Sequence, residues 1–159
     1  MSGDGLRASG SEITAALAEA RTSGASATDL LAEAVRRIEA ASERFDWVGV
    51  YLLEDGELVL GPYIGAATDH VRIPVGRGVC GTAVAEDRDI NVPDVRELDN
   101  YIACSVGTRS ELVVLIREPE TGRVRGQLDL DSDRVAAFTS EDERELKRVA
   151  DWLGDALTA

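Results

Sequence analysis

Residues 46–63 read DWVGVYLLEDGELVLGPY, two apolar segments on either side of Asp55-Gly56. Tryptophan, valine and tyrosine favour extended backbone, and an Asp-Gly pair between two such segments is a strong signal for a tight hairpin turn. The stretch therefore predicts a strand over residues 46–54, a second strand over residues 57–63, and antiparallel pairing between them.

Strand-like patterns continue on the C-terminal side of this hairpin. Four further strands are predicted, over residues 70–75, 89–92, 111–118 and 123–131. Pro93 closes the second of these, which indicates an edge strand, and residues 119–122 form the turn between the last two. A short helix is predicted over residues 80–86. Residues 94–110 are expected to be a long irregular segment with one helical turn around residues 98–102, and loops of this length are often functional.

Helices are predicted at both ends of the chain. Residues 11–22 are rich in alanine, and a second helix opens near Ser26 or Thr28. The last helix begins with a cap at Thr139 or Ser140. Helices on both sides of about six mostly antiparallel strands indicate an α+β fold, with the N- and C-terminal helices packed on one face of a central sheet.

Composition and charge limit the classes of protein. The 159 residues are 44% hydrophobic and carry 30 Asp+Glu against 17 Lys+Arg, a formal net charge of −13. We expect one globular domain over residues 11–157, after a flexible tail over residues 1–10. The negative field repels nucleic acid and anionic membranes, so neither is an expected partner. With two cysteines, no hydrophobic signal core and no apolar run near the roughly 18 residues of a membrane span, a cytoplasmic protein is expected.

The two cysteines are the first candidates for chemistry. Cys80 lies in GRGVCG (residues 76–81), where the first turn of a helix would stabilise its thiolate, although a buried cysteine that only packs is the alternative. Cys104 lies in the long irregular segment, which favours access. The same glycines match a dinucleotide-binding motif, but only about eight residues separate Gly81 from the next strand, too few for a crossover helix.

Acidic and aromatic side chains form a second set of candidates. In QLDLD (residues 127–131), Asp129 and Asp131 project from one face of a strand. Glu111 begins the neighbouring strand, so three acids converge at one sheet end and could transfer protons or bind a cationic group, although a solvent-facing polar strand explains the alternation equally well. Trp47 and Tyr51 share a strand face and could form a ligand wall or core.

His70 is the only histidine of the chain. Together with Cys80 and Cys104 it could supply three zinc ligands. No C-x-x-C or H-E-x-x-H spacing supports a metal site, so we expect none.

Four blocks of sequence occur in an order and at a spacing that resemble the free methionine-(R)-sulfoxide reductases, which are single GAF domains. The blocks are WVGVYLL (47–53), VRIPVGRGVCGTAVAEDRDINVPDV (71–95), IAC with TRSELVV (102–104 and 108–114) and QLDLDS (127–132). The resemblance spans residues 28–157. It implies the GAF fold and an enzyme that reduces free L-methionine (R)-S-oxide to L-methionine without a bound cofactor.

The resemblance also implies roles for the candidate residues. Cys104 matches the nucleophile and Cys80 its resolving partner, so that a sulfenic acid gives way to a disulfide that a thioredoxin-type reductant reduces. The family's acidic site residues correspond to Glu111, Asp129 and Asp131. The substrate's methylthio end meets an aromatic wall that corresponds to Trp47 and Tyr51.

One position departs from the family. Members usually carry a third cysteine where this chain has His70. The alternative function is therefore a non-catalytic GAF module that senses a small ligand or a redox state. GAF relatives are often dimers through their terminal helices, which favours a homodimer here.

Overall fold

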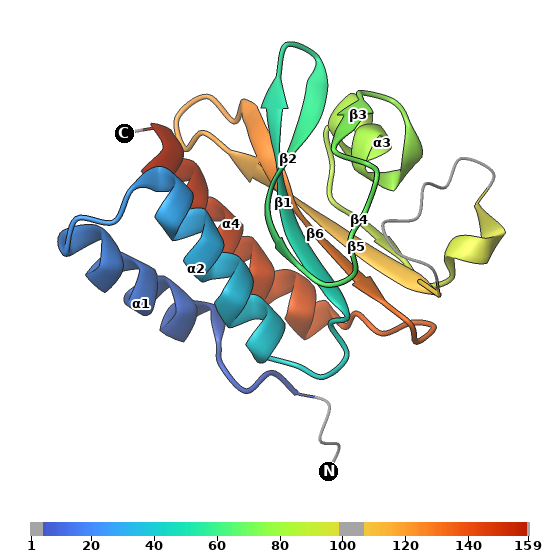
Figure 1. The fold of residues 1–159 in the computed structure, drawn as a ribbon, viewed down its shortest axis with the longest axis horizontal. Coiled ribbons are helices and arrows are strands. Elements are labelled where there is room, and N and C mark those ends of the chain that lie inside the picture. The colour runs from blue at the N-terminus through green and yellow to red at the C-terminus, as the bar shows by residue number, and fades with distance from the viewer. Residues whose placement is uncertain (1–4, 99–106, 159) are drawn as a thin grey trace.

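The structure of the chain is a computed structural model that describes residues 5–98 and 107–158 (Figure 1). The helices are α1 (Gly10–Thr22), α2 (Ala27–Ala40), α3 (Gly78–Glu86) and α4 (Ser140–Thr158), with a 3-10 turn η1 (Val95–Glu97). The strands are β1 (Trp47–Glu54), β2 (Glu57–Ile64), β3 (Arg72–Pro74), β4 (Ile90–Val92), β5 (Ser110–Arg117) and β6 (Val124–Ser132).

The six strands form one sheet in the order β3-β2-β1-β6-β5-β4, and each neighbouring pair is antiparallel. The predicted hairpin is confirmed, with Glu54 opposite Glu57. Asp55 and Gly56 have φ values of 50° and 79°, the positive values that a two-residue type I′ turn requires. The strand that ends before Pro93 is at the edge of the sheet, as predicted.

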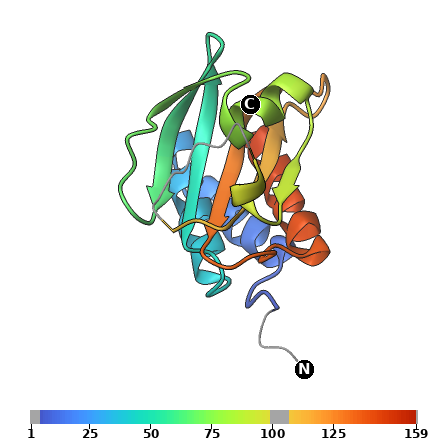
Figure 2. The ribbon, with the colours of Figure 1, turned by 90° about the vertical axis from the view of Figure 1, so that its right-hand side faces the viewer.

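The helices divide between the two faces of the sheet. Figure 1 shows α1, α2 and α4 on one side and α3 on the other, and in Figure 2 the three terminal helices lie behind the sheet as seen from the α3 side. Helix α4 packs on β5 and β6, α2 packs on β1 and β2, and α1 packs on the other two helices. This arrangement confirms the predicted α+β fold.

Polar caps set the start of each terminal helix. Ser9 and Glu12 form a capping box at α1, and Ser26 and Asp29 form another at α2. At α4 the Thr139 hydroxyl accepts from the Asp142 N–H, and the Asp142 carboxylate accepts from the Thr139 N–H. The buried Asp142 carboxylate also accepts two hydrogen bonds from Arg44, which ties α4 to the segment before β1.

Several predicted boundaries differ from the structure. The predicted strand over residues 70–75 is shorter, because Pro74 cannot donate to a sheet and Gly76, at φ 94°, turns the chain toward α3. Helix α3 begins at Gly78, before the predicted residue 80. The 3-10 turn η1 precedes the helical turn expected around residues 98–102, of which residues 99–102 lie outside the described part of the chain.

The predicted tail, residues 1–10, includes positions that contact the domain. The Arg7 N–H donates to the Ala41 carbonyl oxygen at 2.8 Å, and the Gly10 N–H donates to the Glu145 carboxylate at 2.7 Å. Ordered structure thus begins before residue 11, and the flexibility of the first residues stays a prediction. None of the helices in the described part of the chain is long and apolar enough to span a membrane.

Candidate active site

Three adjacent strands place the candidate acids and aromatic residues on the same face of the sheet. Trp47 of β1 lies opposite Asp131 of β6, and Glu111 of β5 lies opposite Asp131 from the other side. Asp129 and Tyr51 belong to the same face because side chains two residues apart along a strand point the same way. The register therefore brings these five residues together on the side of the sheet that α3 covers.

The acids of this face are buried. Glu111 and Asp131 are 1% exposed and Asp129 is 0% exposed, so the solvent-facing alternative for this strand is wrong. Alternation along β6 does separate the acids from the leucines, but α3 packs over the acidic side and shields it from solvent. Burial of a carboxylate costs several kcal/mol unless partners compensate, so three together indicate a binding or catalytic role rather than a contribution to stability.

Glu111 differs electrostatically from an ordinary glutamate. Burial raises the pKa of its carboxyl group well above the usual value, and the nearby charges of Asp129 and Asp131 raise it further. Its Oε1 atom is buried and has no hydrogen-bond partner among the described residues. Glu111 therefore keeps its proton to a higher pH than an exposed glutamate and has an oxygen available for a ligand.

Cys80 lies beside this carboxyl group. It is the third residue of α3 and 4% exposed, and its Sγ–H donates to Glu111 Oε2 at 3.7 Å. The Gln127 amide of β6 donates to the Cys80 carbonyl oxygen at 3.1 Å and so links α3 to the sheet. Cys80 is buried, as its packing alternative predicted, but its thiol faces the acids, whereas Arg77 is exposed at the N-cap.

Backbone conformation and close packing explain the glycines of residues 76–81. Gly76 and Gly78 have φ values of 94° and 65°, which favour glycine. A Cβ at Gly81 would lie 2.5 Å from the Pro74 carbonyl oxygen, so glycine allows α3 to approach β3. The strand after α3 pairs antiparallel with β5, and the dinucleotide-binding alternative is therefore excluded.

The aromatic residues form a stack at the same face. Trp47 and Tyr51 are both 0% exposed, with ring centroids 6.4 Å apart. Trp47 Nε1 donates to the Ala66 carbonyl oxygen, and the Tyr51 hydroxyl donates to the His70 carbonyl oxygen. Tyr63, which no sequence pattern indicated as a site residue, stacks on Trp47 with the ring centroids 5.3 Å apart.

Glycine also shapes the aromatic stack. A Cβ at Gly49 would lie 2.4 Å from the Trp47 ring, so the indole lies over Gly49, whose partner on β6 is Asp129. The W-V-G-V-Y motif could have indicated this contact, because a glycine inside a strand often marks a close approach by another group.

The remaining candidate residues are the predicted nucleophile, Cys104, and the histidine of the zinc alternative, His70. Cys104 lies within residues 99–106, outside the described part of the chain. His70 contributes backbone hydrogen bonds to Tyr51 and Thr68. Among the described residues, the group with the spacing of metal ligands is Cys80, Glu111 and Asp129, a set different from the Cys80, Cys104 and His70 alternative of the sequence.

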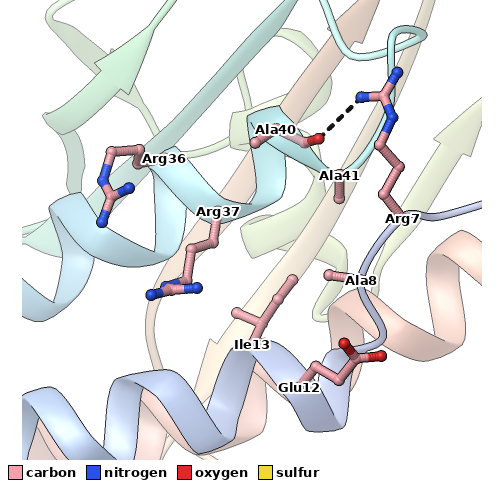
Figure 3. Close-up of a pocket in the computed structure, with 8 residues that line it drawn as sticks. All are labelled: Arg7, Ala8, Glu12, Ile13, Arg36, Arg37, Ala40 and Ala41. Carbon is pink, nitrogen blue, oxygen red and sulfur yellow. Dashed lines mark hydrogen bonds between the residues drawn. The ribbon is translucent and has the colours of Figure 1, made fainter.

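Several pockets of the described part of the chain lie outside the acid cluster. One of about 290 Å³ lies between α1 and α2 (Figure 3), where Arg7 donates to the Ala40 carbonyl oxygen while Arg36 and Arg37 both pair with Glu33. A second pocket of about 310 Å³ adjoins α3 and β4 and is mostly apolar. Neither is lined by the buried acids.

Comparisons with known proteins identify the class of protein that this fold and site define. A GAF domain family model matches residues 26–157, and the chain belongs to the GAF domain family. Within that family it belongs with the free methionine-R-sulfoxide reductases, which are oxidoreductases.

The relatives show how far this similarity extends. The chain is 45% identical over 112 residues to the free methionine-R-sulfoxide reductase of Escherichia coli, a match that covers 70% of this chain and 66%, just under two thirds, of that protein. The type II enzyme of Thermoplasma acidophilum is 39% identical, with a TM-score of 0.77 over 80% of this chain and 89% of that one. The enzyme of Neisseria meningitidis in complex with its substrate is 34% identical, with a TM-score of 0.83 over 94% and 88%.

Proposed function

We propose that this protein reduces free L-methionine (R)-S-oxide to L-methionine. One observation carries the proposal: in a homologue of free methionine-R-sulfoxide reductases, a thiol, three buried carboxyl groups and an indole share one covered face of the sheet. A zwitterionic amino acid with a sulfur-containing side chain matches these groups in charge and in polarity.

The proposed reaction has three steps. The Cys104 thiolate attacks the sulfoxide sulfur, the oxygen passes to Cys104 as a sulfenic acid with uptake of a proton, and methionine leaves as the thioether. The Cys80 thiol then attacks the sulfenic sulfur, which releases water and forms a disulfide. A thioredoxin-type dithiol reduces that disulfide by exchange and becomes oxidised itself.

The acids are proposed to divide two tasks. Glu111, whose pKa is raised by burial and by the neighbouring acids, supplies the proton that the sulfoxide oxygen takes up. Asp129 and Asp131 hold the ammonium group of the free amino acid. Trp47 and Tyr51 contact the methylthio end, because thioether sulfur packs favourably against aromatic rings.

Cys80 is proposed as the resolving cysteine. Its thiol already lies in the cluster, 3.7 Å from Glu111 Oε2. A disulfide requires Cα atoms within about 7 Å of each other, so Cys104 must reach that distance from Cys80 during the cycle. Mass spectrometry after substrate turnover is expected to detect a Cys80–Cys104 disulfide, and two free thiols would remove Cys80 from this role.

A steady-state assay with thioredoxin, thioredoxin reductase and the R epimer tests the function. We expect methionine formation by the wild type, none above background by Cys104→Ser, and strongly slowed turnover by Cys80→Ser. The S epimer is the matched substrate control. If the wild type is no faster than Cys104→Ser but still binds methionine sulfoxide, the protein is a sensor module instead.

The residue at position 70 supplies a second test of the cycle. If the third cysteine of the family improves recycling, His70→Cys is expected to raise the rate of the reductant-dependent step. An unchanged rate would show that Cys80 alone is sufficient.

We further propose that the protein is cytoplasmic and forms a homodimer through its terminal helices. Light scattering after size exclusion tests the dimer, and a mass near the 17.0 kDa of one chain would exclude it.

A further inference from the structure

Three different side chains bring ligand atoms together between α3 and the sheet. Cys80 Sγ and one carboxylate oxygen each of Glu111 and Asp129 all lie within 4.8 Å of one another, and all three residues are buried. They come from α3, β5 and β6, so the fold rather than one local motif holds the group together.

We propose that the reduced protein binds one Zn²⁺-class divalent cation through Cys80 Sγ and the carboxylates of Glu111 and Asp129, and that this cation blocks the reductase site. Only the blocking of substrate rests on the proposed function. On binding, the thiol and any protonated carboxyl group release their protons to solvent, and no group is oxidised or reduced.

The distances fit a tetrahedral ion. Zinc bonds of about 2.3 Å to sulfur and about 2.1 Å to oxygen place neighbouring ligand atoms about 3.4–3.6 Å apart. Cys80 Sγ and Glu111 Oε2 are already 3.7 Å apart. The Asp129 carboxylate oxygen lies within 4.8 Å of the other two ligand atoms, so it completes the set by an approach of at most about 1.4 Å. Three protein ligands leave the fourth position to water.

An unsatisfied atom independently points to a ligand here. Glu111 is 1% exposed, and its Oε1 has no hydrogen-bond partner among the described residues. Oε1 belongs to the same carboxyl group whose Oε2 accepts from Cys80, so it lies in the cluster. A buried acceptor without a partner costs about 1–3 kcal/mol, and a cation bound by this carboxylate, through either oxygen or both, would offset that cost.

The donor set selects the kind of metal. A thiolate with two carboxylates suits zinc or cobalt, whereas Mg²⁺ and Ca²⁺ prefer oxygen ligands alone. Three negative ligands around a divalent ion leave a net charge of −1, which reduces the repulsion among the buried acids.

Cobalt spectroscopy of tag-free reduced protein tests the site without using enzyme activity. Adding Co²⁺ is expected to give a thiolate-to-cobalt charge-transfer band at one Co²⁺ per chain, and Zn²⁺ is expected to displace it. Cys80→Ser is expected to abolish the band. Glu111→Gln and Asp129→Asn are each expected to weaken Co²⁺ binding by at least about tenfold. If Glu111→Gln does not fold, Asp129→Asn still tests the carboxylate ligands.

The matched controls are Cys104→Ser, which removes the other thiol, and Asp69→Asn, which removes an exposed acid. Both are expected to keep the band. A band that survives Cys80→Ser, a band that disappears with Cys104→Ser, or no band in the wild type would each overturn the proposal.

Inhibition kinetics test the second half of the proposal. Zn²⁺ is expected to raise the KM for methionine sulfoxide, and a chelator is expected to restore it. An intact cobalt band with no reductase activity would refute the proposed function and leave the metal site standing. Full activity with the site saturated by Zn²⁺ would refute the blocking.

Discussion

The two faces of the sheet are formed by the same strands but have opposite effects on stability. On the face toward α1, α2 and α4, the alternating residues of β1, β5 and β6 are buried and apolar, among them Val48, Val114 and Leu130. On the face toward α3, the intervening positions include three buried acids. Apolar burial stabilises the first face, whereas the second keeps carboxylates out of water at a cost in stability. Such a division is typical of proteins in which the residues of a functional site lower the free energy of unfolding.

Leu130→Ala on the helix-facing side tests the stabilising face and has the largest expected effect. The leucine is 0% exposed, so its truncation is expected to lower the free energy of unfolding by about 2–5 kcal/mol, measured by urea denaturation. The folded fraction is expected to keep its activity. Val135→Ala, at a position 48% exposed, is the control. Equal losses for both variants would contradict the assignment of Leu130 to the core.

Gly49→Ala on the site-facing side tests whether the indole must lie over the strand. The added Cβ would come within 2.4 Å of the Trp47 ring and 2.9 Å of Tyr63 Cβ. We expect a loss of about 1–3 kcal/mol in the free energy of unfolding, together with a changed tryptophan fluorescence spectrum. Gly5→Ala meets no atom within 4 Å and is the control. An unchanged spectrum would show that the ring does not occupy this space.

Glu111 is expected to give the α3-facing side of the sheet a pH-dependent effect on stability, which the apolar side lacks. Burial, and then the charges of Asp129 and Asp131, raise the pKa of this carboxyl group in the folded state above the 4.5 of an ordinary glutamate. Between those two values the folded state binds more protons than the unfolded state, so the free energy of unfolding falls as pH rises.

Glu111→Gln is expected to remove this component, which amounts to at most about 1.4 kcal/mol per pH unit. Denaturation at a series of pH values above 4.5 measures it as the difference between wild type and variant. Leu130→Ala is the control, because it is expected to shift the whole curve without changing its slope. Parallel curves for wild type and Glu111→Gln would mean that Glu111 titrates normally in the folded protein.

Tyr63→Ala has the smallest expected effect on stability. Tyr63 is 37% exposed and stacks on Trp47 at 5.3 Å. Loss of the aromatic pair is expected to cost about 0.5–1.5 kcal/mol and to raise the KM for methionine sulfoxide more than it changes kcat. Tyr63→Phe keeps the ring and is expected to behave as wild type. A change in kcat alone would indicate that Tyr63 acts in the reaction step rather than in substrate binding.

Local signals explain which parts of the fold were predictable. The Asp55-Gly56 turn and the polar caps at Ser26 and Thr139 depend on residues within a few positions of one another. The turn was found where the sequence placed it, and each cap was found at one of the two positions that the sequence indicated. Tyr63 escaped prediction because its contact with Trp47 depends on how β2 pairs with β1, which no pattern within either strand encodes.

The sequence by itself determined the α+β fold, the hairpin, and the alternation that separates Asp129 from Leu130 along one strand. These features follow from backbone geometry and turn chemistry, which act over short distances along the chain. Only the tertiary structure decided that the acidic face is covered and that the thiol of Cys80 donates to Glu111. Burial and electrostatics depend on which segments meet in space, and α3 returns across a sheet whose neighbouring strands come from distant parts of the chain.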